Sequence, residues 1–197
     1  MKVLIAIPTG YEEGIHPQVV GVLCQILLHK DKYIIDTYIS SMRGIGEHRN
    51  KIVTDFLKTD FDFLLMIDSD NPPPNNVLDL IELNKEVIGL PTPINMNYIK
   101  GLNEIQWNIF KGGFPTKTTG QGLQEVEAVG SGVMLIRRDV LEKINNPFTT
   151  VRNKADLRTV GTDTAFCKKC QDKGIKVWTH WDFKCKHFKQ IDLLTLI

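Results

Sequence analysis

Short apolar runs alternate with amphipathic stretches over the first 90 residues, and this alternation constrains the fold more than any other feature. The runs Lys2–Pro8 and Phe61–Ile67 are largely apolar, which is typical of strands buried on both faces. The stretches between the runs place apolar residues at the spacing of one helix face. Strands and helices that alternate in this way form a mostly parallel central sheet with helices on both faces, so we predict an α/β fold. The predicted strands are Lys2–Pro8, Tyr33–Ile39, Phe61–Ile67 and Val87–Leu90, and the predicted helices are Pro17–His29, Glu47–Lys58 and Asn75–Leu83.

The remainder of the chain is less regular. Residues 91–125 are rich in Gly, Pro, Thr and Asn, a composition typical of a lid or binding loop with small hairpins. A length of 197 residues favours one compact domain. The aromatic residues of the loop are Tyr98, Trp107, Phe110 and Phe114. After the loop we expect two strands (126–129 and 133–136) around Gly130-Ser131-Gly132, two helices (138–144 and 162–173) and a strand-like end (177–187).

The charges are balanced overall but unevenly distributed. The chain has 24 Lys and Arg and 23 Asp and Glu, for a net charge of +1, which excludes a protein that coats polyanions by charge alone. Residues 151–190 nevertheless hold ten Lys or Arg against four Asp. This basic stretch favours a partner that carries phosphate.

The cysteines and the start of the chain bear on its compartment. Met1 leads directly into a strand-like segment without the pattern of a signal peptide, and no apolar run reaches the length of a membrane span. We therefore expect a cytoplasmic protein with reduced thiols and with Cys24 in the core. One alternative stays open: Cys167, Cys170, Cys185 and His187 have the ligand types of a structural zinc site. Against it, Cys167 and Cys170 fall inside a predicted amphipathic helix, where free Cys is usually a small buried hydrophobe.

Asp68-Ser69-Asp70 is the strongest local signal for chemistry. It directly follows a predicted buried strand, and ligands bind at the carboxyl ends of parallel strands. Two carboxylates there can hold Mg²⁺ or Mn²⁺ together with substrate phosphates. A plain surface turn is the alternative. A phosphatase with an aspartyl nucleophile is disfavoured, because Pro72 stands where such enzymes need Thr or Val.

Taken in order, the motifs resemble the GT-A glycosyltransferases, in particular small members similar to family 2. The resemblance implies a single GT-A-like catalytic domain over residues 1–197, with a Rossmann-like nucleotide-binding half (1–90) and a half that completes the acceptor and metal sites (91–197). The matching segments are Pro8-Thr9, Glu47-His48-Arg49-Asn50, Asp68-Ser69-Asp70, residues 128–138, Gly161-Thr162-Asp163 and His187.

The resemblance also implies roles for particular residues. Mn²⁺ or Mg²⁺ would be held by Asp70 and His187, with Asp68 nearer the ribose or the metal's waters, and would neutralise a departing diphosphate. Arg49 would reach the ribose or base, although an exposed helix charge is the alternative. Lys186 and Lys189 are candidates for additional neutralisation, and a solvated face is their alternative. The nucleotide would be lined by Pro8, Thr9 and Gly10.

Asp163 is the expected base if the enzyme inverts the configuration of the sugar. Its alternative role is that of an acidic residue at a helix start. The family's usual Glu-Asp pair is Thr162-Asp163 here, with Thr162 expected as the N-cap, so inverting and retaining courses both stay open. Gly130-Ser131-Gly132 would let backbone approach the sugar, or would form a hairpin bend.

Three functions follow from these patterns. The first is transfer of a sugar from a nucleotide diphosphate sugar, with UDP-sugar favoured, to an unidentified acceptor hydroxyl, for which a glycan and a modified nucleic acid are the candidates. The second is a sugar nucleotidylyltransferase, which would need a Gly-rich, Arg-containing loop after the first strand. Residues 8–13 are acidic and lack that loop. The third is a non-catalytic module that binds carbohydrate or nucleic acid. The sequence assigns neither the acceptor nor the oligomeric state.

Overall fold

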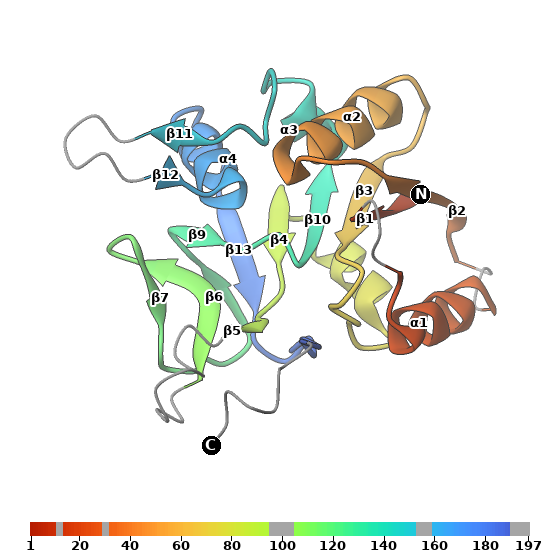
Figure 1. Ribbon diagram of the computed structural model, residues 1–197, viewed down its shortest axis with the longest axis horizontal. Helices are drawn as coiled ribbons and strands as arrows, with labels where there is room; N and C mark the ends of the chain where they lie inside the picture. Colours follow the sequence, from red (N-terminus) through yellow and green to blue (C-terminus); the bar gives the residue numbers. More distant parts are fainter. Residues whose placement is uncertain (11–13, 29–31, 95–104, 153–158, 190–197) are drawn as a thin grey trace.

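A seven-stranded mixed sheet forms the centre of the molecule (Figure 1). The computed structural model describes residues 1–10, 14–28, 32–94, 105–152 and 159–189, and no side chains at 151–152 and 159–160. Strand order across the sheet is β2-β1-β3-β10-β4-β13-β8. The strands are β1 (Lys2–Thr9), β2 (Ile34–Ser41), β3 (Phe63–Ile67), β4 (Val87–Gly89), β8 (Leu123–Glu125), β10 (Val133–Arg137) and β13 (Val177–His180).

Strand directions confirm the predicted mostly parallel sheet. Strands β1, β2 and β3 are parallel, and β13 is parallel to β4. Strand β10 is antiparallel to both β3 and β4, so β3 and β4 run the same way, and β8 is antiparallel to β13. The carboxyl ends of β1, β3, β4 and β13 therefore lie at one edge of the sheet. We call it the carboxyl edge.

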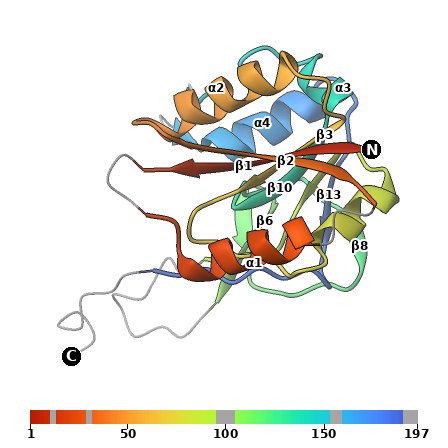
Figure 2. The same ribbon diagram turned by 90° about the vertical axis from the view of Figure 1, so that its right-hand side faces the viewer.

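Helices cover both faces of the sheet, as predicted (Figure 2). One face packs against α2 (Ile45–Leu57), α3 (Arg138–Leu141) and α4 (Thr162–Gln171), in a core that includes Phe56, Phe148 and Phe166. The other face packs against α1 (Pro17–Leu28) and the 3₁₀-helix η1 (Val77–Leu83). Central strands buried on both sides explain the continuous apolar runs in the sequence.

Residues 91–125 contain strands of a second, smaller sheet. It consists of β5 (Pro93–Ile94), β6 (Gln106–Lys111) and β7 (Phe114–Thr116), and β9 (Ala128–Val129) pairs with β6. A separate two-stranded ladder joins β11 (Val151–Arg152) to β12 (Thr159–Val160). The antiparallel pair of β6 and β7 confirms the hairpin predicted within residues 91–125. Tyr98, one of the aromatic residues of that segment, lies outside the described residues.

The hairpin bend expected at Gly130-Ser131-Gly132 is wrong. Strand β9 belongs to the small sheet and β10 to the large one, so the tripeptide crosses between two sheets. Both glycines are required by close contacts. A Cβ on Gly130 would lie 2.9 Å from Asn108 Cβ, and one on Gly132 would lie 2.6 Å from Asn71 Oδ1. The tripeptide thus joins the two sheets at the carboxyl edge.

Three further expectations differ from the structure. The segment expected as a helix over 75–83 is the 3₁₀-helix η1, which follows three prolines and ends at Asn84 in the left-handed conformation. Cys24 is exposed, because α1 buries Val19, Leu23 and Ile26. The last described strand ends at His180, well before the predicted end at 187.

Within the described residues, no helix has the length and hydropathy that crossing a membrane requires.

Candidate functional site

The carboxyl edge brings together most of the predicted site residues. The loop Asp68-Ser69-Asp70 follows β3, and Pro8 and Thr9 end β1, where both are buried. Thr9 Oγ1 donates to the Ser40 carbonyl (3.0 Å), and Ser41 Oγ donates to the Gly10 carbonyl (2.9 Å). These bonds fasten the end of β1 to β2.

We define the inner side of the loop as Asp68, Arg49 and Thr162. Arg49, from α2, is 5% exposed, and its Nη2 donates to both carboxylate oxygens of Asp68 at 2.8 and 3.0 Å. Its Nη1 donates to Thr162 Oγ1 (3.4 Å), at the start of α4. The alternative of an exposed helix charge is therefore wrong for Arg49. The direct contact of Arg49 with a ribose or base stays a prediction.

Several charges act on Asp68. Burial raises the pKa of the Asp68 carboxyl, and the Arg49 guanidinium opposes that rise. The carboxylates of Asp70 and Asp163 raise it further. Two neighbouring carboxylates and one buried guanidinium therefore act on Asp68, an arrangement that an added cation would stabilise.

We define the outer side as Asp70, His187 and Lys189. Asp70 Oδ2 lies 2.7 Å from Lys189 Nζ and 3.4 Å from His187 Nε2. Burial favours a higher pKa for Asp70, but the hydrogen bonds from His187 and Lys189 outweigh it and lower the pKa to about 2. The carboxylate is thus ionised at neutral pH.

The tautomer of His187 follows from its second contact. His187 Nδ1 lies 2.8 Å from the Pro93 carbonyl oxygen, which can only accept, so Nδ1 carries the proton. When the ring carries a second proton, Nε2 donates toward Asp70; in the neutral ring, Nε2 can instead offer its lone pair to a metal ion. Metal-binding histidines are usually oriented in this way by a carbonyl or carboxylate on the other nitrogen.

The segment that carries His187 is tied to the loop by its backbone. The N–H of Lys186 donates to the Pro72 carbonyl (3.2 Å), and that of Phe188 donates to the Asp70 carbonyl (3.0 Å). The Phe188 ring stacks on His16 at 3.8 Å. Sequence reasoning missed His16 and Phe188, because contacts between irregular segments leave no periodic signal.

Asp163 lies in the first turn of α4, near the glycine crossing. Its Oδ2 accepts from the Ser131 backbone N–H (3.3 Å) and its Oδ1 from the Thr164 N–H (2.9 Å). The N-cap is Gly161, so the expected capping role of Thr162 is wrong; its hydroxyl accepts from Arg49 instead. The contact with Thr164 fits an acidic residue at a helix start. The role of Asp163 as a base stays a prediction.

The outer side has the donor chemistry of an Mg²⁺ or Mn²⁺ site. Among the described residues, no group of three or more His, Cys, Asp and Glu is arranged to hold a metal ion. Asp70 Oδ2 and His187 Nε2 nevertheless lie 3.4 Å apart, close to the roughly 3 Å between adjacent ligands of an octahedral ion, so the two could serve together as ligands. Because such ions are commonly held by one or two side chains plus substrate phosphates, this pair fits a metal that arrives with a diphosphate.

The zinc alternative is wrong. Cys167 and Cys170 lie on the buried face of α4, and Cys185 belongs to the core on the other face of the sheet. Burial raises the pKa of the Cys167 and Cys185 thiols to about 12, so both are protonated at neutral pH. These cysteines are core residues.

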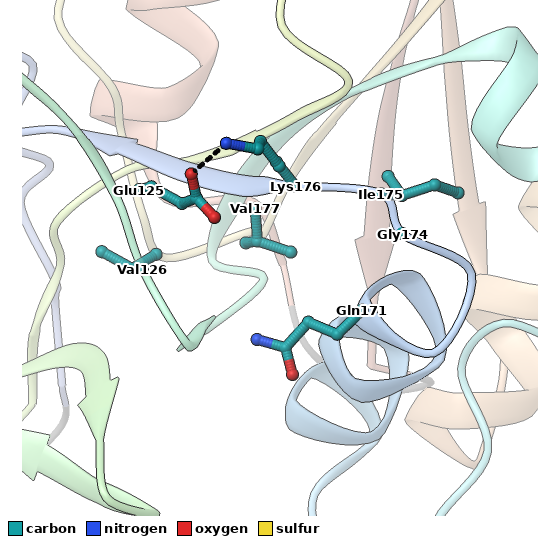
Figure 3. Close-up of a pocket in the computed structure, with 7 residues that line it drawn as sticks. All are labelled: Glu125, Val126, Gln171, Gly174, Ile175, Lys176 and Val177. Atoms are coloured by element: carbon teal, nitrogen blue, oxygen red, sulfur yellow. Dashed lines mark hydrogen bonds and ion pairs between the residues drawn. The ribbon is translucent and has the colours of Figure 1, made fainter.

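Two cavities lie elsewhere. One of about 240 Å³ is bordered by β8, the end of α4 and β13, and the residues of the Glu125–Lys176 ion pair (2.7 Å) are part of its lining (Figure 3). Another, of about 470 Å³, is lined in part by Phe110, Gln124 and Trp181. Neither cavity is lined by residues of the inner or outer side.

No family model matches the sequence, and neither does any curated protein. Solved structures do match. A197 from STIV superposes with a TM-score of 0.61 at 19% identity, over 96% of this chain and 87% of that one. TarS 1–349 from S. aureus, in complex with UDP-GlcNAc, gives 0.59 at 15% identity, over 97% and 60%. GalNAc-T7 with UDP, GalNAc and Mn²⁺ gives 0.61 at 8% identity, over 98% and 44%.

A nucleotidyltransferase is also similar in structure. CMP:2-keto-3-deoxy-manno-octonic acid synthetase, complexed with CTP, gives a TM-score of 0.50 at 14% identity, over 98% of this chain and 93% of that one. The chain spans less than two thirds of the two glycosyltransferase chains. At these identities the likeness concerns the fold. The protein has a GT-A-like fold, which confirms the architecture expected from its motifs.

Proposed function

We propose that the protein is a metal-dependent glycosyltransferase that uses a nucleotide diphosphate sugar, with UDP-sugar favoured. The observation that carries the proposal is the outer side. There an ionised Asp70 and an oriented His187 nitrogen lie 3.4 Å apart at the carboxyl edge of a GT-A-like sheet. Lys189, which donates to Asp70, supplies a positive charge that would help to bind a diphosphate.

In this proposal the nucleotide lies over the ends of β1 and β3. Pro8, Thr9 and Gly10 line the base, and their attachment to β2 keeps that surface in place. Asp68 points its carboxylate toward the ribose or the metal's waters. Arg49 acts through Asp68, since its guanidinium is committed to that carboxylate and to Thr162.

Asp70 and His187 would hold Mn²⁺ or Mg²⁺. When bound, the metal would act as a Lewis acid that neutralises the diphosphate leaving group. Asp163 would accept the proton of the acceptor hydroxyl in an inverting reaction. The Ser131 and Thr164 N–H groups orient its carboxylate. The acceptor would be a glycan or a modified nucleic acid.

A sugar nucleotidylyltransferase is the second candidate. Its support is the likeness to the CTP-bound synthetase, which has a lower TM-score than the glycosyltransferases. The acidic residues after β1 disfavour it, because a nucleotidyl transfer needs basic groups on the triphosphate.

Thermal unfolding with metal and nucleotide tests the proposal. Mn²⁺ plus UDP at about 100 times the dissociation constant should stabilise the protein by about 2.7 kcal/mol, or roughly 5–10 °C. Asp70→Asn should abolish that rise. Asp182→Asn, which alters an exposed carboxylate in the same segment, should keep it.

Activity separates the candidate functions. Incubation with a panel of radiolabelled sugar nucleotides should show metal-dependent transfer or slow hydrolysis of one donor. Exchange of pyrophosphate into nucleotide would instead identify a nucleotidylyltransferase. Absence of a thermal shift with Mn²⁺ and every nucleotide diphosphate tested would contradict the proposal.

A further inference from the structure

We infer that Lys189 has two alternative partners: the Asp70 carboxylate in the free protein, and the diphosphate of the nucleotide once a metal ion has taken Asp70. The inference rests on the proposed function. It assigns to Lys189 the coupling of metal binding to nucleotide binding. Lys189 should therefore oppose the binding of metal alone and favour the binding of metal with nucleotide.

The contacts of Lys189 support an exchangeable partner. Its Nζ lies 2.7 Å from Asp70 Oδ2, the same oxygen that faces His187 Nε2. A metal ion held by Asp70 and His187 would therefore claim the oxygen that Lys189 uses. The Lys189 side chain is 61% exposed, so it can leave Asp70 without breaking packing.

The backbone keeps Lys189 close after such an exchange. The neighbouring Phe188 donates its N–H to the Asp70 carbonyl (3.0 Å), and its ring stacks on His16. Nζ can then move only on its own flexible stem, within reach of the same loop. A divalent ion at Asp70 would repel the ammonium, and the diphosphate oxygens would offer it new acceptors.

A coupling free energy follows from these two roles. The ion pair with Asp70 must be broken before metal alone can bind, which weakens metal affinity. With nucleotide present, the released ammonium gains a phosphate contact. Nucleotide must then strengthen metal binding, and metal must strengthen nucleotide binding by the same factor.

The other lysines of this segment serve as a reference. Lys186 Nζ donates to Gln18 Oε1 on α1 (3.1 Å). Lys184 is exposed and lies on the same segment. Lys184→Met is therefore the matched control for Lys189→Met, since both remove one exposed positive charge.

The experiment measures Mn²⁺ affinity, from the electron paramagnetic resonance signal of free Mn²⁺, for the unaltered protein and the two variants, with and without UDP. Without UDP, Lys189→Met should bind Mn²⁺ about two- to fivefold more tightly. With Mn²⁺ saturating, calorimetry should show that Lys189→Met binds UDP at least about threefold more weakly than the unaltered protein does. Lys184→Met should change neither affinity by as much as twofold.

The opposite signs of the two effects make the test decisive, because a general disturbance of the edge would weaken both. Unchanged or weaker Mn²⁺ binding by Lys189→Met, in a protein whose unaltered form binds Mn²⁺ and UDP, would overturn the inference and leave the proposed function intact. Failure of the unaltered protein to bind Mn²⁺ even with UDP would overturn both.

Discussion

The two sides of the Asp68-Ser69-Asp70 loop use the same carboxylate chemistry in different surroundings. On the inner side Asp68 meets Arg49, whose side chain is 6% exposed, and the pair also contacts the start of α4. On the outer side Asp70 meets Lys189, which is 61% exposed, and a histidine whose other nitrogen is already engaged. The two carboxylates are both half-buried, so the two ion pairs differ mainly in their cations, a buried guanidinium and an exposed ammonium.

The difference in the exposure of the two cations gives the inner side a structural role and lets the outer side exchange its partners. The pair between a buried guanidinium and a half-buried carboxylate is costly to break, because the guanidinium alone is left charged in a poorly solvated place. An exposed ammonium is replaced at small cost, because water solvates it once it is released. The inner side therefore holds α2, β3 and α4 in register, and the outer side is free to exchange its partners.

Removal of the Arg49 guanidinium should have the largest effect. Arg49→Met leaves Asp68 charged and without its buried partner, and should lower the free energy of unfolding by about 3–5 kcal/mol in urea denaturation. Adding Asp68→Asn should restore most of the loss. As the matched control, Arg137→Met removes an equally well-paired guanidinium that is 30% exposed, beside Asp139, and should cost under about 1 kcal/mol. If Arg49→Met and Arg137→Met lowered the free energy of unfolding equally, burial of the Arg49 guanidinium would add nothing to the stability of its ion pair.

A methyl group at the glycine crossing should have an intermediate effect. Gly132 accepts the Asp68 N–H at its carbonyl (2.7 Å), and an added Cβ would lie 2.6 Å from Asn71 Oδ1. Gly132→Ala should therefore lower the free energy of unfolding by about 1–3 kcal/mol. Gly14→Ala, where nothing lies within 4 Å, is the control and should be close to neutral. A neutral Gly132→Ala would show that the inner side tolerates movement.

The outer side should contribute least to stability, and only above acid pH. The pKa of Asp70 is about 2 in the folded protein, below the roughly 3.9 of an unfolded chain, so its stabilising contribution is present above about pH 4 and is lost as the pH falls toward 2. Asp70→Asn should cost under about 1 kcal/mol at pH 7, because the partner lysine is exposed, and nothing at pH 2. Urea denaturation at both pH values measures this. If Asp70→Asn lowered the free energy of unfolding by about 3 kcal/mol, or by the same amount at both pH values, Asp70 would contribute to stability as the inner side does.

Much of the fold was predictable from local patterns. The apolar run around Phe63–Ile67 indicated a central strand, and the acidic residues after it indicated a ligand site at the carboxyl edge. The place of β10 between β3 and β4 was not predictable, because pairing between strands from the two halves of the chain leaves no trace in either segment's periodicity. The same holds for the crossing at Gly130 and Gly132, whose tight contacts are with Asn108 and Asn71.

The sequence by itself determined most of the strands and helices of the first 67 residues, and that two carboxylates follow a buried strand. The buried face of a helix or strand is made of side chains a few residues apart, so the spacing of apolar residues along the sequence reveals the element. Only the tertiary structure decided which partner each carboxylate has. Arg49 reaches Thr162 across 113 residues, and Lys189 reaches Asp70 across 119. Contacts over such separations depend on how whole strands pack. The difference between a carboxylate held in place and one free to exchange its partner therefore emerged only once the chain was folded.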